Sequence, residues 1–250
     1  MTIRIPLLRD HPDAPFPDPR DALREPDGLL AFGGDLSPPR LLNAYAHGIF
    51  PWYSEGQPIL WWSPDPRMVF RTDGVHLSRR FRQQLRKLDW TIKADTAFDR
   101  VLLNCANSPR IGQSGTWITD AMRAAYGELH RLGYAHAIEV WDGALLVGGL
   151  YGVAIGRMFF AESMFSAVSG GSKIALTALA ALLREWGWPL IDAQVESGHL
   201  LRMGATSIRR DAFLDIIARQ TAFADEIGPW TVRVGEHGLD WLLAGSRPAN

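Results

Sequence analysis

The chain has 250 residues, of which 47% are hydrophobic and 21% charged, so it can fold around a substantial core as one large domain or two unequal ones. A formal net charge of −1 excludes a polycation, and any contact with nucleic acid must come from a local basic patch. The single cysteine, Cys105, excludes an intramolecular disulfide and a zinc site built from cysteines.

The N-terminus and the longest apolar run argue against export and membrane insertion. The stretch MTIRIPLLRDHPDAPFPDP lacks the apolar core of a secretory signal. The run IALTALAALL is too short to span a bilayer. We therefore expect a soluble, cytoplasmic protein.

Residues 1–66 are rich in proline and glycine and are expected to form a small N-terminal domain of short strands and turns. One helix is predicted at 39–47, because Ser37 can cap it and two prolines begin it. The segment SPDPR at 63–67 leads into longer periodic elements. We therefore predict a second, larger domain over residues 67–250.

Residues 77–88 have the period of an amphipathic helix, with Leu77, Phe81, Leu85 and Leu88 on one face. The opposite face carries five basic residues and no acidic one: Arg79, Arg80, Arg82, Arg86 and Lys87. A run of charge is usually a solvated helix face. Exposed helices commonly mix both signs, however. This face is therefore a candidate contact for a phosphate backbone.

Helices and strands alternate along the rest of the chain. Helices are predicted at 120–133, 172–187 and 210–223, and strands at 135–141, 144–154, 157–165 and around Asp192. Successive antiparallel strands, a buried helix and a further strand indicate an α+β fold. The pattern is compatible with an acetyltransferase-like domain, whose mixed, mostly antiparallel sheet splays where an acyl donor binds.

Three polar side chains lie in apolar surroundings: Glu162 in FFAESMF, and Asp192 with Gln194 in PLIDAQ. Side chains at positions i and i+2 of a strand share a face, and an unpaired buried carboxylate is very unfavourable. A lone buried polar group usually satisfies a helix end or a loop. Three such groups on neighbouring elements favour a ligand site in an apolar pocket.

Other chemical motifs are weak. Gly170, Gly171 and Ser172 precede a helix and could hold an anion or form a plain cap, and their spacing is not that of a P-loop. The seven histidines show no ligand spacing, so we predict no metal site. No serine or cysteine has the sequence context of a catalytic nucleophile.

Three long stretches carry a resemblance to a known family: 25–67, 115–166 and 190–205. They include GGDLSPPRLLNAYAHGIFPW, GTWITDAMRAAYGELHRLGY and LIDAQVESGHLLRMGA, and the match covers most of the chain from residue 15 to about 220. The chain resembles the leucyl/phenylalanyl-tRNA–protein transferases. The resemblance implies transfer of Leu or Phe from aminoacyl-tRNA to the N-terminal Arg or Lys of a protein. The product is a destabilising N-terminus for bacterial degradation. No metal or free cofactor is implied.

The resemblance also implies roles for the residues. Asp192 and Gln194 become catalytic: Gln194 faces the reacting centre, and Asp192 hydrogen-bonds and orients it. Glu162 faces the acceptor peptide, where a buried carboxylate suits Arg or Lys. We interpret the carbonyl of Gln194 as positioning the α-amine and Asp192 as stabilising its developing charge, with a tRNA ribose hydroxyl relaying the proton. The family's amino-acid pocket maps onto Trp52, Trp117, Leu150, Phe159, Leu176 and Leu179. Each of these residues could equally be core packing.

The basic face would contact the tRNA acceptor stem through Arg79, Arg80, Arg82 and Lys87, and Lys173 would lie near the 3′ end. Two positions depart from the family pattern. Ser197 stands where an Asn is frequent, and RMGA at 202–205 replaces a Ser before Leu-Gly-Ala. The chain beyond about residue 225 lies outside the resemblance, and no function is assigned to it.

Two other functions stay open. An acyl-CoA-dependent N-acetyltransferase of the same fold would need a glycine-rich pyrophosphate loop, which SAVSGGSK fits poorly. A non-catalytic RNA-binding module would need stacking aromatics on exposed strands beside the basic face. It would also leave the three buried polar residues unexplained.

Overall fold

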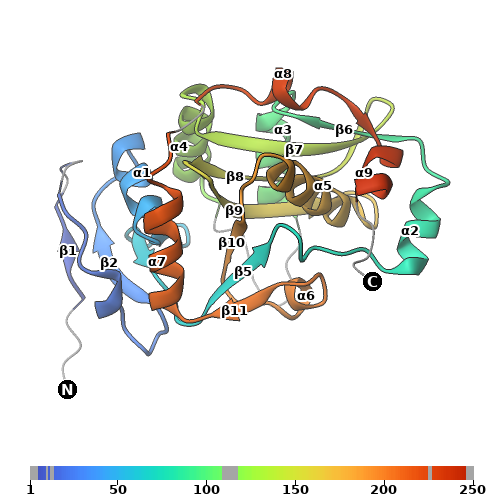
Figure 1. Cartoon of the computed structure of the whole chain (residues 1–250). Coiled ribbons are helices and arrows are strands. Elements are labelled where there is room, and N and C mark those ends of the chain that lie inside the picture. The colour runs from blue at the N-terminus through green and yellow to red at the C-terminus, as the bar shows by residue number, and fades with distance from the viewer. Residues whose placement is uncertain (1–4, 10, 12–13, 109–117, 225–226, 246–250) are drawn as a thin grey trace.

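The computed structural model describes residues 5–9, 11, 14–108, 118–224 and 227–245, which form a mixed α+β fold with two sheets (Figure 1). The α+β prediction is therefore confirmed. Among these residues, no helix is long and apolar enough to cross a membrane.

The smaller sheet lies in the N-terminal part and has the strand order β1-β2-β4-β3. Its strands are β1 Leu7–Leu8, β2 Leu29–Gly33, β3 Phe50–Pro51 and β4 Leu60–Trp62. A short 3-10 helix, η1 (Pro19–Asp21), precedes β2, and helix α1 (Pro38–Ala46) joins β2 to β3. Helix α1 lies within one residue of its predicted bounds. Trp61 is fully buried and ties β4 to the core.

The larger sheet has eight strands in the order β11-β5-β10-β9-β8-β7-β6-β12, and all neighbours except β9 and β10 are antiparallel. This confirms the mixed, mostly antiparallel sheet. Its strands are β5 Arg67–Arg71, β6 Trp90–Ala94, β7 Ala135–Asp142, β8 Leu145–Ile155, β9 Met158–Ser166, β10 Leu190–Gln194, β11 Thr206–Ile208 and β12 His237–Gly238.

Helices cover both faces of the larger sheet. Helix α5 (Gly171–Glu185) packs on one face. It is apolar on nearly all sides because nearly all of its side chains are buried. Three other helices pack on the opposite face together with α1. They are α3 Phe98–Asn107, α4 Asp120–Arg131 and α7 Arg210–Gln220. Buried residues of the smaller sheet pack into the same hydrophobic core as these four helices, so a domain boundary at residue 66 stays a prediction.

Strands β9 and β10 diverge at their carboxyl ends. They pair in parallel only between Met158–Phe160 and Leu190–Asp192. After Asp192 the register of β10 against β5 is broken by a bulge, and Gln194 has a φ of +62°. Because a bulge re-aims the side chains that follow it, the last residues of β10 turn away from β9. The splay expected of an acetyltransferase-like sheet is therefore present.

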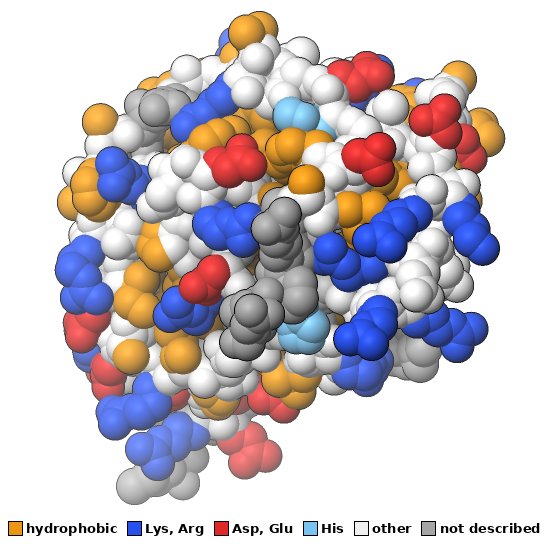
Figure 2. Space-filling model, turned by 45° about the vertical axis from the view of Figure 1, so that its right-hand side comes forward, with side chains coloured by type: hydrophobic (Ala, Val, Ile, Leu, Met, Phe, Trp, Pro, Cys, Tyr) orange, Lys and Arg blue, Asp and Glu red, His pale blue; other side chains and the backbone are white. Residues whose placement is uncertain are grey.

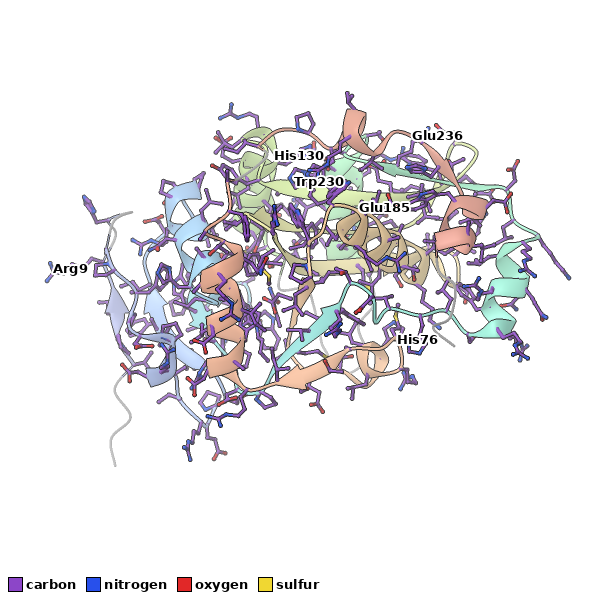
Figure 3. The ribbon with its side chains drawn as sticks, viewed as in Figure 1. Arg9, His76, His130, Glu185, Trp230 and Glu236 are labelled. Carbon is purple, nitrogen blue, oxygen red and sulfur yellow. The ribbon has the colours of Figure 1, made fainter. Side chains whose placement is uncertain are left out.

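The C-terminal segment lies along the β6 edge of the larger sheet. It contains α8 (Thr231–Val234), the strand β12 paired with β6, and α9 (Leu239–Gly245). Trp230 is buried and stacks on His136 with ring centroids 4.0 Å apart, and Glu236 forms an ion pair with Lys93 of β6 (Figure 3). The segment therefore covers a sheet edge that would otherwise be open.

Candidate active site

A cavity of about 380 Å³ opens where β9 and β10 diverge. Side chains from β3, β5, β8, α5 and the short helix α6 (Gly198–Leu201) make its walls mostly apolar. Few polar groups reach it, and they come from the two splayed strands and the loop after them: Glu162, Ser163, Gln194, Glu196 and Ser197. An apolar cavity with a few converging polar groups is typical of a ligand site.

Glu162 is the buried acid of this cavity and is 8% exposed. Its Oε1 accepts hydrogen bonds from the Tyr45 hydroxyl at 2.7 Å and the Gln194 side-chain amide at 2.7 Å, and its Oε2 accepts one from the Tyr126 hydroxyl at 2.8 Å. The two hydroxyls also contact each other. Helix α1 supplies Tyr45 and helix α4 supplies Tyr126, so two helices of one sheet face fix this carboxylate.

Burial controls the charge of this cluster. Burial raises the pKa of the Glu162 carboxyl from 4.5 to about 7, although its three hydrogen bonds act in the opposite direction. Burial, followed by the nearby Glu162 charge, also raises the pKa values of Tyr45 and Tyr126 well above 10. Glu162 is therefore the group in the site that changes charge near neutral pH.

Gln194 presents one end of its amide to the cavity. The amide nitrogen Nε2 is the end that faces Glu162 and donates to its carboxylate. The carbonyl oxygen Oε1 is then the end of the amide that a substrate donor could meet. Gln194 lines the cavity.

Asp192 lies behind Gln194 and does not line the cavity. Its Oδ1 accepts from Nε of Arg67 at 2.8 Å, and its Oδ2 accepts from Nη2 of the same guanidinium at 2.7 Å. Oδ1 also accepts the backbone N–H of Gln194 at 2.9 Å. Protein groups therefore satisfy both oxygens of this carboxylate without a substrate. Arg67 is a site residue that the sequence did not reveal, although a fully buried acid requires a partner such as a cation nearby.

The predicted amino-acid pocket is only partly assembled. Trp52, Leu150 and Leu176 line the cavity. Phe159 and Leu179 are fully buried and do not line it. Phe159 lies where β9 still pairs with β10, below the splay, and Leu179 lies about one helical turn beyond Leu176. Trp117 lies outside the described residues.

The basic residues lie on α2 (Arg79–Leu85), a helix shorter than predicted, and on the turn that follows it. Arg79, Arg80 and Lys87 are exposed, whereas Arg82 is half-buried and donates to the backbone carbonyl of Leu243 in α9 at 3.0 Å. Lysine and arginine side chains gather on the side of the molecule that carries α2 (Figure 2). Arg82 is therefore less available to a ligand than the other three.

A second cavity, of about 720 Å³, lies between α2 and the start of α5. Arg80, Phe81, Lys173 and His199 are among its lining residues, and the Lys173 ammonium lies 5.6 Å from the centre of the Phe81 ring. The two cavities share α5 and α6, because Leu176 and Leu200 line the first and Lys173 and His199 the second. Basic side chains thus stand next to the apolar cavity.

The family model described as leucyl/phenylalanyl-tRNA protein transferase matches residues 69–218, and the model of its N-terminal domain matches residues 34–65. The chain belongs to this transferase family. A leucyl/phenylalanyl-tRNA–protein transferase from Xanthomonas campestris is 66% identical over 96% of both chains, and one from Xylella fastidiosa is 59% identical over 92% of this chain and 95% of its own.

Solved structures add little to this assignment. The structure of L-PGS from Bacillus licheniformis aligns with 78% of this chain and 74% of its own, with a TM-score of 0.39 and 9% identity. A likeness of that size carries no argument about fold or function. Within the described residues, no group of three or more His, Cys, Asp or Glu side chains is placed to hold a metal ion.

Proposed function

We propose that this transferase moves Leu or Phe from aminoacyl-tRNA to the α-amine of a protein that begins with Arg or Lys, in the cytoplasm, and so marks that protein for degradation. One observation carries the proposal: the apolar cavity ends on the Gln194–Glu162 pair and adjoins a second cavity whose lining includes Arg80 and Lys173. The apolar cavity matches the side chain of the transferred amino acid, the Gln194–Glu162 pair matches the acceptor amine, and the second cavity matches the end of the RNA.

The apolar walls support Leu and Phe as the transferred amino acids. A polar side chain would lose its hydrogen bonds to water among Trp52, Leu150 and Leu176, whereas an apolar one would gain by burial. Apolar pockets separate similar side chains weakly, by roughly 1–3 kcal/mol per methylene. We therefore also propose Met as a minor donor.

Glu162 supports a cationic acceptor. A carboxylate offers roughly four acceptor positions, and Tyr45, Tyr126 and Gln194 occupy three of them. One position is left for a charge-assisted hydrogen bond, which either a Lys ammonium or one N–H of an Arg guanidinium can make. This agrees with a choice of Arg or Lys rather than of Arg alone.

The reaction is aminolysis of an ester. The α-amine forms a C–N bond to the aminoacyl carbonyl carbon, the bond from that carbon to the ribose oxygen breaks, and the amine proton passes to the leaving oxygen. An α-amine has a pKa of about 8, so it needs orientation more than a strong base. We assign this task to Oε1 of Gln194, which can accept an amine N–H. Because Asp192 lies behind Gln194 and accepts its backbone N–H, we propose that it acts through this residue and not on the substrate.

The basic side chains are proposed to hold the RNA. Arg79, Arg80 and Lys87 would contact phosphates of the acceptor stem, and Lys173 would lie near the 3′ end, whose aminoacyl group enters the adjoining cavity. Phosphate contacts carry no sequence information, which suits an enzyme that accepts tRNAs for two amino acids. Arg82 is the weakest of these candidates because of its bond to Leu243.

One assay tests the proposal. Labelled Phe-tRNA is incubated with the protein and a peptide that begins with Arg, and label joined to the peptide is counted, with acetyl-CoA as the control donor. We expect peptide-bound Phe and no acetylation. Acetylation would support the acyl-CoA enzyme instead, and RNA binding without transfer would support the non-catalytic module.

A further inference from the structure

We infer that Arg67 is a positioning residue for this reaction, which holds the side chain of Gln194 at the cavity by fixing Asp192 beneath it. The inference rests on the proposed function, because it assigns Gln194 to the reacting centre. Nothing in the sequence marks Arg67 as part of the site, since it is 125 residues away from Asp192 along the chain.

The contact between Arg67 and Asp192 fixes a direction as well as a distance. The guanidinium meets both carboxylate oxygens, at 2.8 and 2.7 Å, and the two side chains are 1% and 0% exposed. A planar fork with two parallel hydrogen bonds defines the plane of the carboxylate, which a lysine ammonium cannot do. Asp192 is therefore held in one orientation.

Other segments fix the guanidinium itself. Its Nη1 donates to the carbonyl of Gly48 at 3.0 Å. Its carbon lies 4.7 Å from the ring centre of Phe50 and 4.6 Å from that of Phe213. Gly48 and Phe50 come from the N-terminal part and Phe213 from α7. A buried cation with aromatic rings and a carbonyl around it has little freedom to move.

Asp192 passes this order on to Gln194. Its Oδ1 accepts the Gln194 backbone N–H at 2.9 Å, across the bulge in β10. Gln194 has a φ of +62°, a left-handed conformation that residues with a Cβ adopt only where their surroundings hold them. The Gln194 amide then reaches Glu162 at 2.7 Å. A chain of contacts thus runs from Arg67 through Asp192 to the cavity.

The test compares two buried arginines. Arg67→Lys keeps the charge and loses the fork, so Gln194 should lose its fixed direction and kcat should fall about 100-fold, as it does for a misplaced reacting group. KM for Phe-tRNA should stay within about twofold, because Trp52, Leu150 and Leu176, which would hold the amino acid, are unchanged. Arg40→Lys is the control: Arg40 is also fully buried and paired with an acid, Asp35, but its hydrogen bonds go to Asp35, Arg9 and His11 and not to Asp192.

A double-mutant cycle separates positioning from general damage. If Arg67 acts through Gln194, then Gln194→Ala in the Arg67→Lys protein should lower kcat little further. A kcat of Arg67→Lys equal to wild type, or a full additional loss from Gln194→Ala, would overturn the inference. If Arg67→Lys does not fold, Phe213→Leu loosens the guanidinium from outside the cavity and should lower kcat severalfold, and an unchanged kcat would overturn the inference equally.

A measurement without transfer distinguishes this inference from the proposed function. The side-chain amide signals of Gln194 in nitrogen-15 NMR report its hydrogen bond to Glu162. They should shift in Arg67→Lys and stay in place in Arg40→Lys. If wild type makes no peptide product, the proposed function is wrong, whatever the signals do. If wild type is active and the Gln194 signals do not move, the positioning role of Arg67 is wrong.

Discussion

The side-chain amide of Gln194 donates a hydrogen bond to the carboxylate of Glu162 over 2.7 Å, across the gap where β9 and β10 no longer pair. The two strands therefore stay joined at the cavity by side chains after their backbone ladder has ended. This bond also sets the direction of the amide, with its nitrogen toward the acid. We propose that the oxygen at its other end meets the substrate and that the function of the site depends on that direction.

Replacing Gln194 by Glu should remove that direction. Two carboxylates would stand at about the same separation as the present hydrogen bond, and like charges in a buried site repel strongly unless one is neutralised. We expect the transfer rate to fall about 100-fold, as measured in single turnovers with Phe-tRNA and an Arg-started peptide. Full activity of Gln194→Glu would show that the amide has no specific role.

Glu162 should make stability depend on pH. Its pKa is about 7 in the folded protein and 4.5 as the ordinary value, so the folded state binds the proton more tightly. The contribution of this group to the free energy of unfolding is fully present below pH 4.5 and is lost as the pH rises through 7. The loss is about 3 kcal/mol in the free energy of unfolding.

The variant Glu162→Gln isolates this effect, since it keeps the shape and cannot ionise. Urea unfolding at pH 5 and pH 8 should show wild type losing more free energy of unfolding than the variant. Parallel pH dependences of the two proteins would mean that Glu162 keeps its ordinary pKa.

The same variant tests acceptor binding. KM for the Arg-started peptide should rise, while KM for Phe-tRNA should stay nearly constant.

Leu176 and Leu179 provide a matched pair on one helix. Leu176 lines the cavity and Leu179 lies in the core. Leu176→Ala enlarges the cavity, so transfer of Leu should fall more than transfer of the larger Phe, by up to about tenfold in their ratio. Leu179→Ala should lower the free energy of unfolding by about 2–5 kcal/mol and leave that ratio unchanged. A changed ratio in Leu179→Ala would place this residue in the pocket after all.

The basic residues should control the salt dependence of tRNA binding. Each phosphate contact contributes roughly 0.7–0.9 to the slope of log affinity against log salt. Replacing Arg79, Arg80 and Lys87 by Gln should therefore reduce the slope by about 2. Arg82→Gln alone should change it little, because Arg82 bonds to Leu243.

A control for charge alone is a triple Gln variant at Arg123, Arg131 and Arg219, which lie on α4 and α7. The slope of log tRNA affinity against log salt concentration should be the same in this variant as in wild type. Equal reductions in both triple variants would mean that overall charge, and not the surface around α2, governs binding.

Local patterns in the sequence predicted much of the sheet. Strands β7, β8 and β9 begin and end within one or two residues of their predicted positions, because Asp142-Gly143 and Ile155-Gly156 mark the turns between them. Helix α2 is shorter than predicted. Ser78 caps its start and accepts the backbone N–H of Phe81, and after Leu85 the chain leaves the helix although the apolar spacing continues to Leu88.

The supporting residues of the site could not be predicted in this way. Tyr45 meets Glu162 from 117 residues away, Tyr126 from 36, and Arg67 meets Asp192 from 125. No periodicity links such positions, because only the folded sheet brings them together. From the sequence, Asp192 and Gln194 are both expected to act on the substrate amine, Gln194 by positioning it and Asp192 by stabilising its developing charge. The bulge between them places Asp192 against Arg67 and Gln194 at the cavity.

The most direct measurement asks whether transfer takes place in the cavity between β9 and β10. An Arg-started peptide is incubated with Phe-tRNA and analysed by tandem mass spectrometry, using wild type and Leu200→Trp, which fills the cavity from its rim on α6. Thermal unfolding is used to check that the variant is folded. We expect Phe on the α-amine of the peptide with wild type and almost none with the variant. An unmodified peptide with wild type, or equal modification by a folded Leu200→Trp, would contradict the assignment of this cavity as the site of transfer.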